Sequence, residues 1–202
     1  MDKQYFSINI RAFLDNELPD MENGEEVLNG LLSDFSCGEL NQDIDNFLHN
    51  SAIESAKKRQ TATYIVLDEN VTVVGYYTIT IKPISVSIEG LSSNEKRKFK
   101  RVSATDKNEQ YFSTSAYLLA QFGKNYILPK EERISGRDLM AFVFDTMKEA
   151  SRSYGGLVQF LECEDVPKLL QFYTGQGFKK FSERMTDGKN SHLLHQLFRF
   201  ID

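Results

Sequence analysis

Residues 171–178 read Gln-Phe-Tyr-Thr-Gly-Gln-Gly-Phe, an aromatic pair followed by two glycines. Pro167 lies four positions earlier and suits the first turn of a helix, because the N–H that proline lacks has no intrahelical acceptor there. The glycines suit the end of that helix, since glycine readily adopts the positive φ of a helix C-terminus. The pattern predicts a short helix over residues 167–174 that carries Tyr173 near its end.

The segments on either side of this helix alternate between strand and helix patterns. Residues 157–163 form a nearly continuous apolar run, which is typical of a strand covered on both faces. Apolar side chains recur at helical spacing over 135–153 and predict a helix that lies on a core. Residues 112–123 read as a strand. Residues 179–185 and 193–200 read as a closing hairpin.

The first half of the chain is less regular. A strand is predicted over 5–10, followed by short helical turns to Gly38. Helical spacing of apolar residues predicts one helix from Asn41 to Lys58. Residues 61–67 and 71–81 are β-branched and aromatic runs around a polar turn, and they predict two antiparallel strands. Residues 84–113 read as a polar insertion with one or two helical turns after Ser92 or Ser93.

Composition limits the class of protein. A chain of 202 residues with 41% hydrophobic content is expected to form one domain over 1–202, with residues 1–34 as its N-terminal strand and helical turns. A net charge of −5 argues against nonspecific coating of nucleic acid, although a local basic patch stays open. The sequence shows neither a signal-peptide pattern nor a membrane-length apolar run, so we expect a cytoplasmic protein with no membrane partner. The two cysteines and three histidines are too scattered to predict a metal site.

The start of the 135–153 helix carries a candidate anion site. The first turn of a helix supplies unpaired N–H groups and a positive dipole end, which suit a pyrophosphate. The hexapeptide 133–138 reads Arg-Ile-Ser-Gly-Arg-Asp. Gly136 would let phosphates approach the backbone, while Arg133 and Arg137 would add charge-assisted contacts.

The same hexapeptide has a purely structural interpretation. Ser135 followed three residues later by Asp138 fits a capping box, in which the carboxylate reaches back to the Ser135 N–H. A carboxylate in that place would repel a pyrophosphate. Both interpretations stay open from the sequence.

The order of these elements resembles the GNAT superfamily of N-acetyltransferases. The family's pyrophosphate loop begins with Arg or Gln, followed by two residues and Gly, and Arg133 and Gly136 match it. Asp138 departs from the Gly or Ala at its last position. The octapeptide 171–178 closely resembles the family's Phe-Tyr and Gly-Phe signature. The resemblance implies an α/β fold of the α+β type: a twisted, mostly antiparallel sheet flanked by helices, with a V-shaped split between two central strands.

The resemblance also implies roles for particular residues. Acetyl-CoA is the implied acyl donor, bound in the split between the strand that ends at Gly123 and the strand 157–163. The implied contacts are Phe122, Gly123, Lys124, Arg133, Ile134, Ser135, Gly136, Arg137 and Asp138. Tyr173 is the implied acid that protonates the departing thiolate. The implied reaction is direct acetyl transfer to a primary amine in a ternary complex.

Upstream segments from residue 35 onward look like the branch of the family that includes toxins acetylating aminoacyl-tRNA. The basic run 96–101 falls where that branch has a short helix. It would either contact an RNA backbone or form a solvated helix face. The acceptor therefore stays open between a small amine, a protein and aminoacyl-tRNA. An antitoxin and a second copy of the chain are the protein partners considered.

The general base is the weakest assignment. Glu162 and Glu164 flank Cys163 and point to the same side of a strand, so either could take a proton from the acceptor ammonium through water, or both could be surface charges. No histidine lies near Cys163 in the sequence, and it is not assigned as a nucleophile. The departure at Asp138 and the missing base leave a non-enzymatic CoA-binding module as the rival function.

Overall fold

The computed structural model describes residues 3–106, 108, 110–186 and 191–202. It contains a mixed eight-stranded sheet with the order β1-β2-β3-β5-β6-β8-β7, in which β4 also pairs with β5. The pair β5–β6 is parallel, and the pairs β1–β2, β2–β3, β6–β8 and β7–β8 are antiparallel. The predicted mixed and mostly antiparallel α/β class is therefore confirmed, whereas the V-shaped split stays a prediction.

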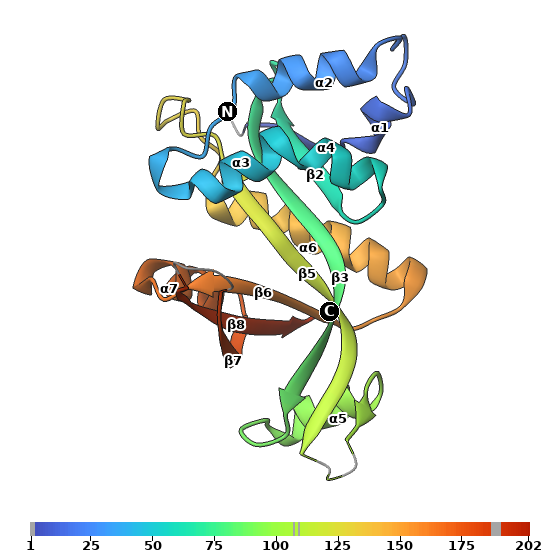
Figure 1. Ribbon diagram of the computed structural model, residues 1–202, viewed down its shortest axis with the longest axis vertical. Coiled ribbons are helices and arrows are strands. Elements are labelled where there is room, and N and C mark those ends of the chain that lie inside the picture. Colours follow the sequence, from blue (N-terminus) through green and yellow to red (C-terminus); the bar gives the residue numbers. More distant parts are fainter. Residues whose placement is uncertain (1–2, 107, 109, 187–190) are drawn as a thin grey trace. The chain divides into compact units, whose positions relative to one another are not determined.

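The elements follow the predicted order (Figure 1). The strands are β1 Tyr5–Asn9, β2 Ala62–Asp68, β3 Val73–Ser87, β4 Ala104–Thr105, β5 Tyr111–Lys124, β6 Val158–Glu164, β7 Lys179–Met185 and β8 Leu193–Phe200. The helices are α1 Arg11–Leu14, α2 Gly24–Ser33, α3 Gln42–Asn50, α4 Ala52–Lys57, α5 Ser93–Lys100, α6 Gly136–Tyr154 and α7 Pro167–Gly175. A 3₁₀ turn covers Glu39–Asn41.

Two helix predictions need correction. The single helix predicted from Asn41 to Lys58 is interrupted at Ser51, whose φ of −132° is not helical. Ser and Asn compete with the helix for backbone hydrogen bonds, and the break falls where Asn50 meets Ser51. The short turns predicted before Gly38 include the ten-residue helix α2, which buries Leu28 and Leu32.

The chain divides into two compact units, and each is described by itself. The first, unit 1, comprises Met1–Thr80 and Ala120–Val143, and the second, unit 2, comprises Ile81–Leu119 and Phe144–Asp202. The expectation of one domain over residues 1–202 stays a prediction. No helix within the described ranges is long and apolar enough to cross a membrane.

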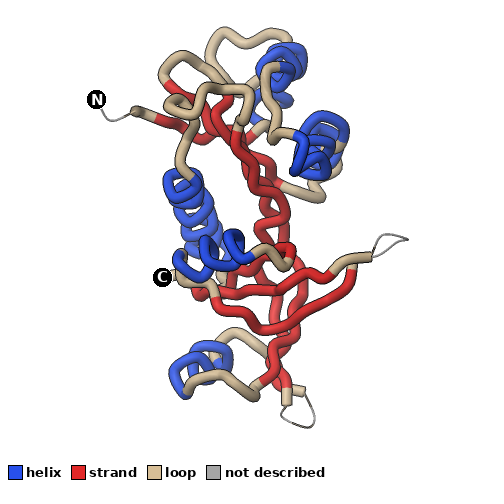
Figure 2. The backbone as a smooth tube through the Cα atoms, turned by 90° about the vertical axis from the view of Figure 1, so that its left-hand side faces the viewer, coloured by secondary structure: helices blue, strands red, loops and turns tan. Residues whose placement is uncertain are grey.

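In unit 1 the sheet is covered on both faces. Helices α1 to α4 pack on one face around a core that includes Phe35, Leu48 and Tyr76. The start of α6 covers the other face, where both methyl groups of Leu139 lie 3.1 Å from the position that a Cβ on Gly75 would occupy. Figure 2 shows these strands between the two helix layers. Neighbouring residues 75 and 76 of β3 thus face opposite layers, as strand alternation requires.

A buried asparagine joins three segments of unit 1. Asn125 follows β5 directly and is 0% exposed. Its Nδ2 donates to the carbonyls of Asp34 and Val73, at 2.9 Å each. Its Oδ1 accepts from the N–H groups of Ser36 at 3.4 Å and Ile127 at 3.0 Å. The amide thus donates both of its N–H hydrogens and accepts two hydrogen bonds at its oxygen, as a buried polar group requires.

Unit 2 has a core of its own. Phe99 of α5 is fully buried and packs against Phe112, Phe198 and Phe200, with ring centroids 4.9–5.5 Å apart. On the opposite face of β6 and β8 lie α7 and the second part of α6, and the ring of Phe144 in α6 is 6.2 Å from that of Phe178, which follows α7. Strands β6 and β8 of this unit therefore also lie between two packed layers, whereas most residues of β7 are exposed.

The region predicted as a polar insertion, 84–113, contributes to that core. It contains the end of β3, helix α5, strand β4 and the start of β5. Its apolar side chains Ile84, Val86, Leu91, Phe99 and Phe112 are buried. The predicted helix start is confirmed, since Ser92 caps α5: the Glu95 N–H donates to Ser92 Oγ at 3.3 Å, and the Ser92 N–H donates to Glu95 Oε2 at 2.7 Å.

Removing the amide of Asn125 should destabilise the fold. Asn125→Ala leaves two carbonyls and two N–H groups without their partner, so we expect the free energy of unfolding to fall by about 2 to 4 kcal/mol. Urea unfolding followed by circular dichroism measures it. Asn29→Ala is the matched control, because Asn29 makes one exposed bond to the Glu25 carbonyl. A loss no larger than that of the control would contradict the role given to Asn125.

Candidate functional site

In unit 1, the predicted acetyl-CoA contacts begin at the end of β5. Gly123 has no space for a side chain: a Cβ there would lie 2.5 Å from Cys37 Sγ, 2.9 Å from Tyr76 Cε1 and 3.1 Å from Ile44 Cγ2. The loop before α3 and α3 itself therefore pack directly on the strand backbone. Burial and the nearby carboxylates of Asp45 and Asp43 raise the pKa of the Cys37 thiol to about 12, so this thiol is protonated and unreactive.

A hydrogen bond to strand β3 shows which N–H groups at the end of β5 point towards β3. The Asn125 N–H donates to the Val74 carbonyl of β3 at 2.9 Å. Because alternate N–H groups of a strand point to the same side, the Gly123 N–H also points towards β3. The N–H groups of Phe122 and Lys124 therefore point away from β3. Of the three acetyl-CoA contacts predicted at the end of β5, these two have N–H groups that are directed away from β3 and so suit a ligand beside the strand.

The loop after β5 is held by Arg133. Its Nε donates to the Leu128 carbonyl at 2.7 Å, and its Nη2 donates to the Tyr126 carbonyl at 2.8 Å. The guanidinium also lies 4.9 Å from the ring centroid of Tyr126. This arginine, predicted as a phosphate contact, thus uses two donors within its own loop. Its positive charge stays near the start of α6.

Lys124 adds a second positive charge to this loop. Its Nζ lies 5.5 Å from the ring centroid of Tyr126, so the ring contacts both cations. Burial, and after it the charge of Arg133, lower the pKa of the Lys124 ammonium. A cation held at an energetic cost next to another cation is stabilised by an anion, which fits a phosphate-binding role.

At the start of α6, Ser135, Arg137 and Asp138 are exposed and Gly136 is half-buried, whereas Ile134 and Leu139 are buried. The Asp138 N–H donates to Ser135 Oγ at 3.1 Å, which is half of the predicted capping box. The second half differs from the prediction: Asp138 Oδ2 accepts from the Ser135 hydroxyl at 2.7 Å. The N–H groups of Gly136 and Arg137 have no acceptor within the helix, as at any helix start. The Asp138 carboxylate lies beside them.

In unit 2, Tyr173 lies on α7 with 8% of its surface exposed. Its ring makes edge contacts with Phe172 and Phe178, at centroid distances of 5.1 and 6.1 Å. Burial, and after it the nearby Cys163, raise the pKa of the Tyr173 hydroxyl well above 10.0. The hydroxyl therefore keeps its proton at any physiological pH and is a hydrogen-bond donor.

The two carboxylates considered as a base differ in their surroundings. Glu162 accepts from Arg184 Nε at 2.7 Å and Nη2 at 2.6 Å, and also from Gln196 Nε2 at 2.7 Å. Burial alone would raise the pKa of Glu162, but the bonds from Arg184 and Gln196 lower it below its ordinary value. Glu164 is 60% exposed and lies 3.5 Å from His192 Nε2. Of the two, Glu164 has the more accessible oxygens.

A buried histidine in unit 2 was not predicted from the sequence. His195 of β8 is the Cα partner of Cys163 in β6 and of Glu183 in β7. Its Nε2 lies 2.9 Å from Asp165 Oδ1. Only the register of the strands brings these residues together, so spacing along the chain could not reveal them. Among the described residues, no group of three or more His, Cys, Asp or Glu side chains is placed to hold a metal ion.

The lowered pKa of Glu162 predicts an acid-dependent stability. The contribution of the Glu162 pair is fully present above the ordinary value of 4.5 and is lost as the pH falls through the lower folded value. Glu162→Gln should therefore be less stable than wild type at neutral pH, and the difference should shrink towards about pH 3. Urea unfolding at a series of pH values measures it. A difference that is independent of pH would contradict the assignment, and Glu164→Gln is the exposed control.

No protein-family profile matches the sequence, and no curated protein matches it as a relative. Solved structures do match. A structure of AtaT complexed with acetyl-methionyl-tRNAfMet is 19% identical, with a TM-score of 0.60, and the match covers 95% of this chain and 94% of that one. A mutant AtaT toxin bound to the C-terminus of the antitoxin AtaR and acetyl-CoA is 17% identical, with a TM-score of 0.56 over 100% of this chain and 94% of that one.

A mutant of KacT is similar to the same degree. It is 19% identical, with a TM-score of 0.60, over 84% of this chain and 87% of that one. At such identities the likeness concerns the path of the backbone. Nearly the whole chain takes part in it, so the chain has the fold of the AtaT and KacT toxins, which the resemblance in its sequence predicted.

Proposed function

We propose that the protein is an acetyl-CoA-dependent N-acetyltransferase that transfers an acetyl group directly to a primary amine. The observation that carries the proposal is the fold likeness over the entire chain to a toxin whose structure contains acetyl-CoA. The retained Phe-Tyr and Gly-Phe octapeptide supports it, because it places a buried tyrosine on α7.

In unit 1, backbone and cations would serve the acyl donor. The N–H groups of Phe122 and Lys124 would polarise the thioester carbonyl, which is the usual way to stabilise a developing oxyanion. The first N–H groups of α6 would receive the pyrophosphate, together with the charges of Lys124 and Arg137. Arg133 would act mainly by holding the loop. The Asp138 carboxylate would oppose phosphate binding and weaken the affinity.

In unit 2, Tyr173 would assist the leaving group. A thiol has a pKa of about 8.5, below that of this buried phenol, so a complete proton transfer from Tyr173 to the thiolate would be unfavourable. A hydrogen bond from the hydroxyl to the sulfur would still stabilise the negative charge as the C–S bond breaks. The acceptor ammonium would first lose a proton, to Glu164 through water or to bulk water.

The test combines binding with turnover. Acetyl-CoA titrated calorimetrically into the wild type should bind, and thiol release with a panel of amines should follow. Tyr173→Phe should bind acetyl-CoA unchanged and release thiol about 100-fold more slowly. Tyr154→Phe is the matched control, because Tyr154 is 86% exposed. Absence of binding at millimolar ligand would refute the transferase, and binding without thiol release across the panel would favour a CoA-binding module.

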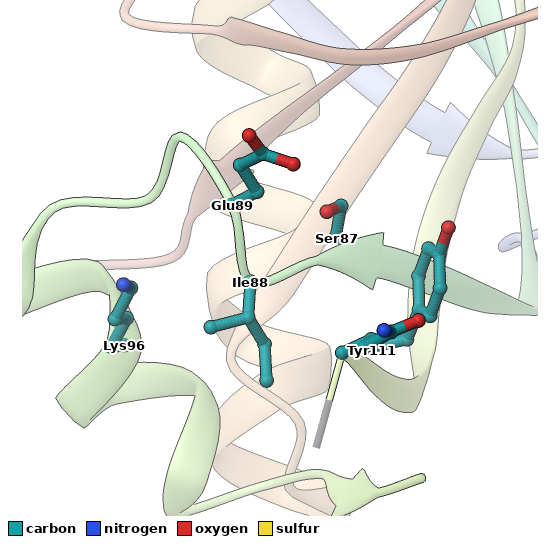
Figure 3. A pocket seen from close by; sticks show the side chains of 6 residues that line it. Ser87, Ile88, Glu89, Lys96 and Tyr111 are labelled. Atoms are coloured by element: carbon teal, nitrogen blue, oxygen red, sulfur yellow. The ribbon is translucent and has the colours of Figure 1, made fainter. Parts of the chain in front are cut away.

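Aminoacyl-tRNA is a second candidate acceptor, and the charge around α5 favours it. Residues 81–111 contain seven Lys and Arg against four Asp and Glu, a net charge of +3 within a chain of −5. Beside α5 the surface forms a hollow of about 370 Å³ (Figure 3). Its lining includes Lys96 and the 45% exposed Tyr111, a cation and an aromatic ring of the kind that bind phosphate and stack on a base. An antitoxin would then be the expected protein partner.

Charge removal on α5 tests that candidate. The double variant Lys96→Ala with Arg101→Ala should bind tRNA more weakly, and the slope of log K against log salt should fall by roughly 1.4 to 1.8, as expected for two lost phosphate contacts. Gel-shift titrations at several salt concentrations measure both quantities. Lys58→Ala with Lys168→Ala removes the same charge elsewhere and should change neither. Equal effects of the two double variants would mean that tRNA responds only to net charge.

A further inference from the structure

A buried imidazole in unit 2, that of His195, has no role in the acetyl transfer proposed above. His195 is 5% exposed and lies in the middle strand of the β6, β8 and β7 ladder. Its Nε2 and Asp165 Oδ1 are 2.9 Å apart, and its Nδ1 and Glu183 Oε1 are 3.2 Å apart. The second contact is not in line for a hydrogen bond, so Nδ1 is buried without one. Buried polar groups with such incomplete partnering call for an explanation.

Asp165 lies at the corner where the chain passes from β6 into α7. Strand β6 ends at Glu164, Val166 is the N-cap of α7, and Pro167 begins the helix. Valine offers no side-chain acceptor, and no side-chain hydrogen bond caps this helix. The bond between Asp165 and His195 is thus a side-chain tie that joins the start of α7 to the sheet beneath it.

The tie acts on the helix that carries Tyr173. Tyr173 lies close enough to Cys163 for that thiol to contribute to its raised pKa, and Cys163 is directly paired with His195 in the ladder. Paired residues of adjacent strands project from the same face of a sheet. His195, Cys163 and Tyr173 therefore belong to one face of unit 2, with α7 packed over it.

We propose that His195 is a positioning residue for Tyr173: by holding Asp165 it fixes the corner at which α7 begins, and so the depth of the tyrosine hydroxyl. The proposal rests on the donor role proposed for Tyr173. The imidazole touches no substrate and performs no chemistry. A histidine suits this place because the ring can stay buried while its Nε2 bonds the Asp165 carboxylate at the rim.

Hydrogen exchange of the α7 amides tests the tie without any ligand. Asp165 is 63% exposed, so its replacement should not prevent folding. In Asp165→Ala the amides of 168–176, corrected for intrinsic rates, should exchange about three to ten times faster than in the wild type. Asp165→Asn keeps an acceptor oxygen and should restore most of the protection. His192→Gln, at an exposed histidine, is the control.

Turnover supplies the second reading. In Asp165→Ala the rate of thiol release should fall about three- to tenfold while the dissociation constant of acetyl-CoA stays within about twofold, with rescue by Asp165→Asn. Unchanged α7 exchange in Asp165→Ala overturns the proposal, as does faster exchange spread over all of unit 2 or the lack of rescue by asparagine. A wild type that fails to bind acetyl-CoA refutes the transferase instead, while the exchange data still decide whether the tie exists.

Discussion

The saturated amide of Asn125 is the constraint on which unit 1 depends. It binds the carbonyls of Asp34 and Val73 and the N–H groups of Ser36 and Ile127, and so joins the end of α2, the start of β3 and the loop after β5. Burying an amide without hydrogen-bond partners costs several kcal/mol, so arrangements of the three segments that leave the Asn125 amide unpaired are unfavourable. That arrangement fixes the residue at which β5 ends.

The candidate donor site follows from that fixed end. Gly123 lies just before the asparagine and is pressed between Cys37, Tyr76 and Ile44, while the Asn125 N–H sets which N–H groups of β5 face away from β3. The loop beyond is closed by Arg133 on its own carbonyls. Arg133 therefore holds the loop that leads to α6, and two of its donors are used there rather than for the phosphate contact that the motif suggested. In unit 2, the ring contacts with Phe172 and Phe178 and the bond between Asp165 and His195 hold the helix that carries Tyr173 in place.

Much of the fold could be predicted because its signals are local. The helix at 136–154, the strands at 158–164 and 193–200 and the capped start of α5 lie where periodicity, proline and serine placed them. The predictions failed where burial competes with local pattern. The apolar residues of 84–113 are too widely spaced among charges to look like a core, yet Phe99 and Phe112 are fully buried because β8 supplies the surface that covers them.

The order of the elements, the fold they resemble and the residue types at the candidate site can all be inferred from local sequence, since helix caps, turn glycines and apolar periods act over a few residues. The contacts that these residues make depend on the folded chain. In the folded chain Arg133 donates to a carbonyl of its own loop, Glu162 accepts from Arg184, and His195 lies beside Cys163 and Asp165. These contacts join residues far apart in the chain, and their partners are selected by strand register and by the need to satisfy buried polar groups, neither of which can be read from local spacing.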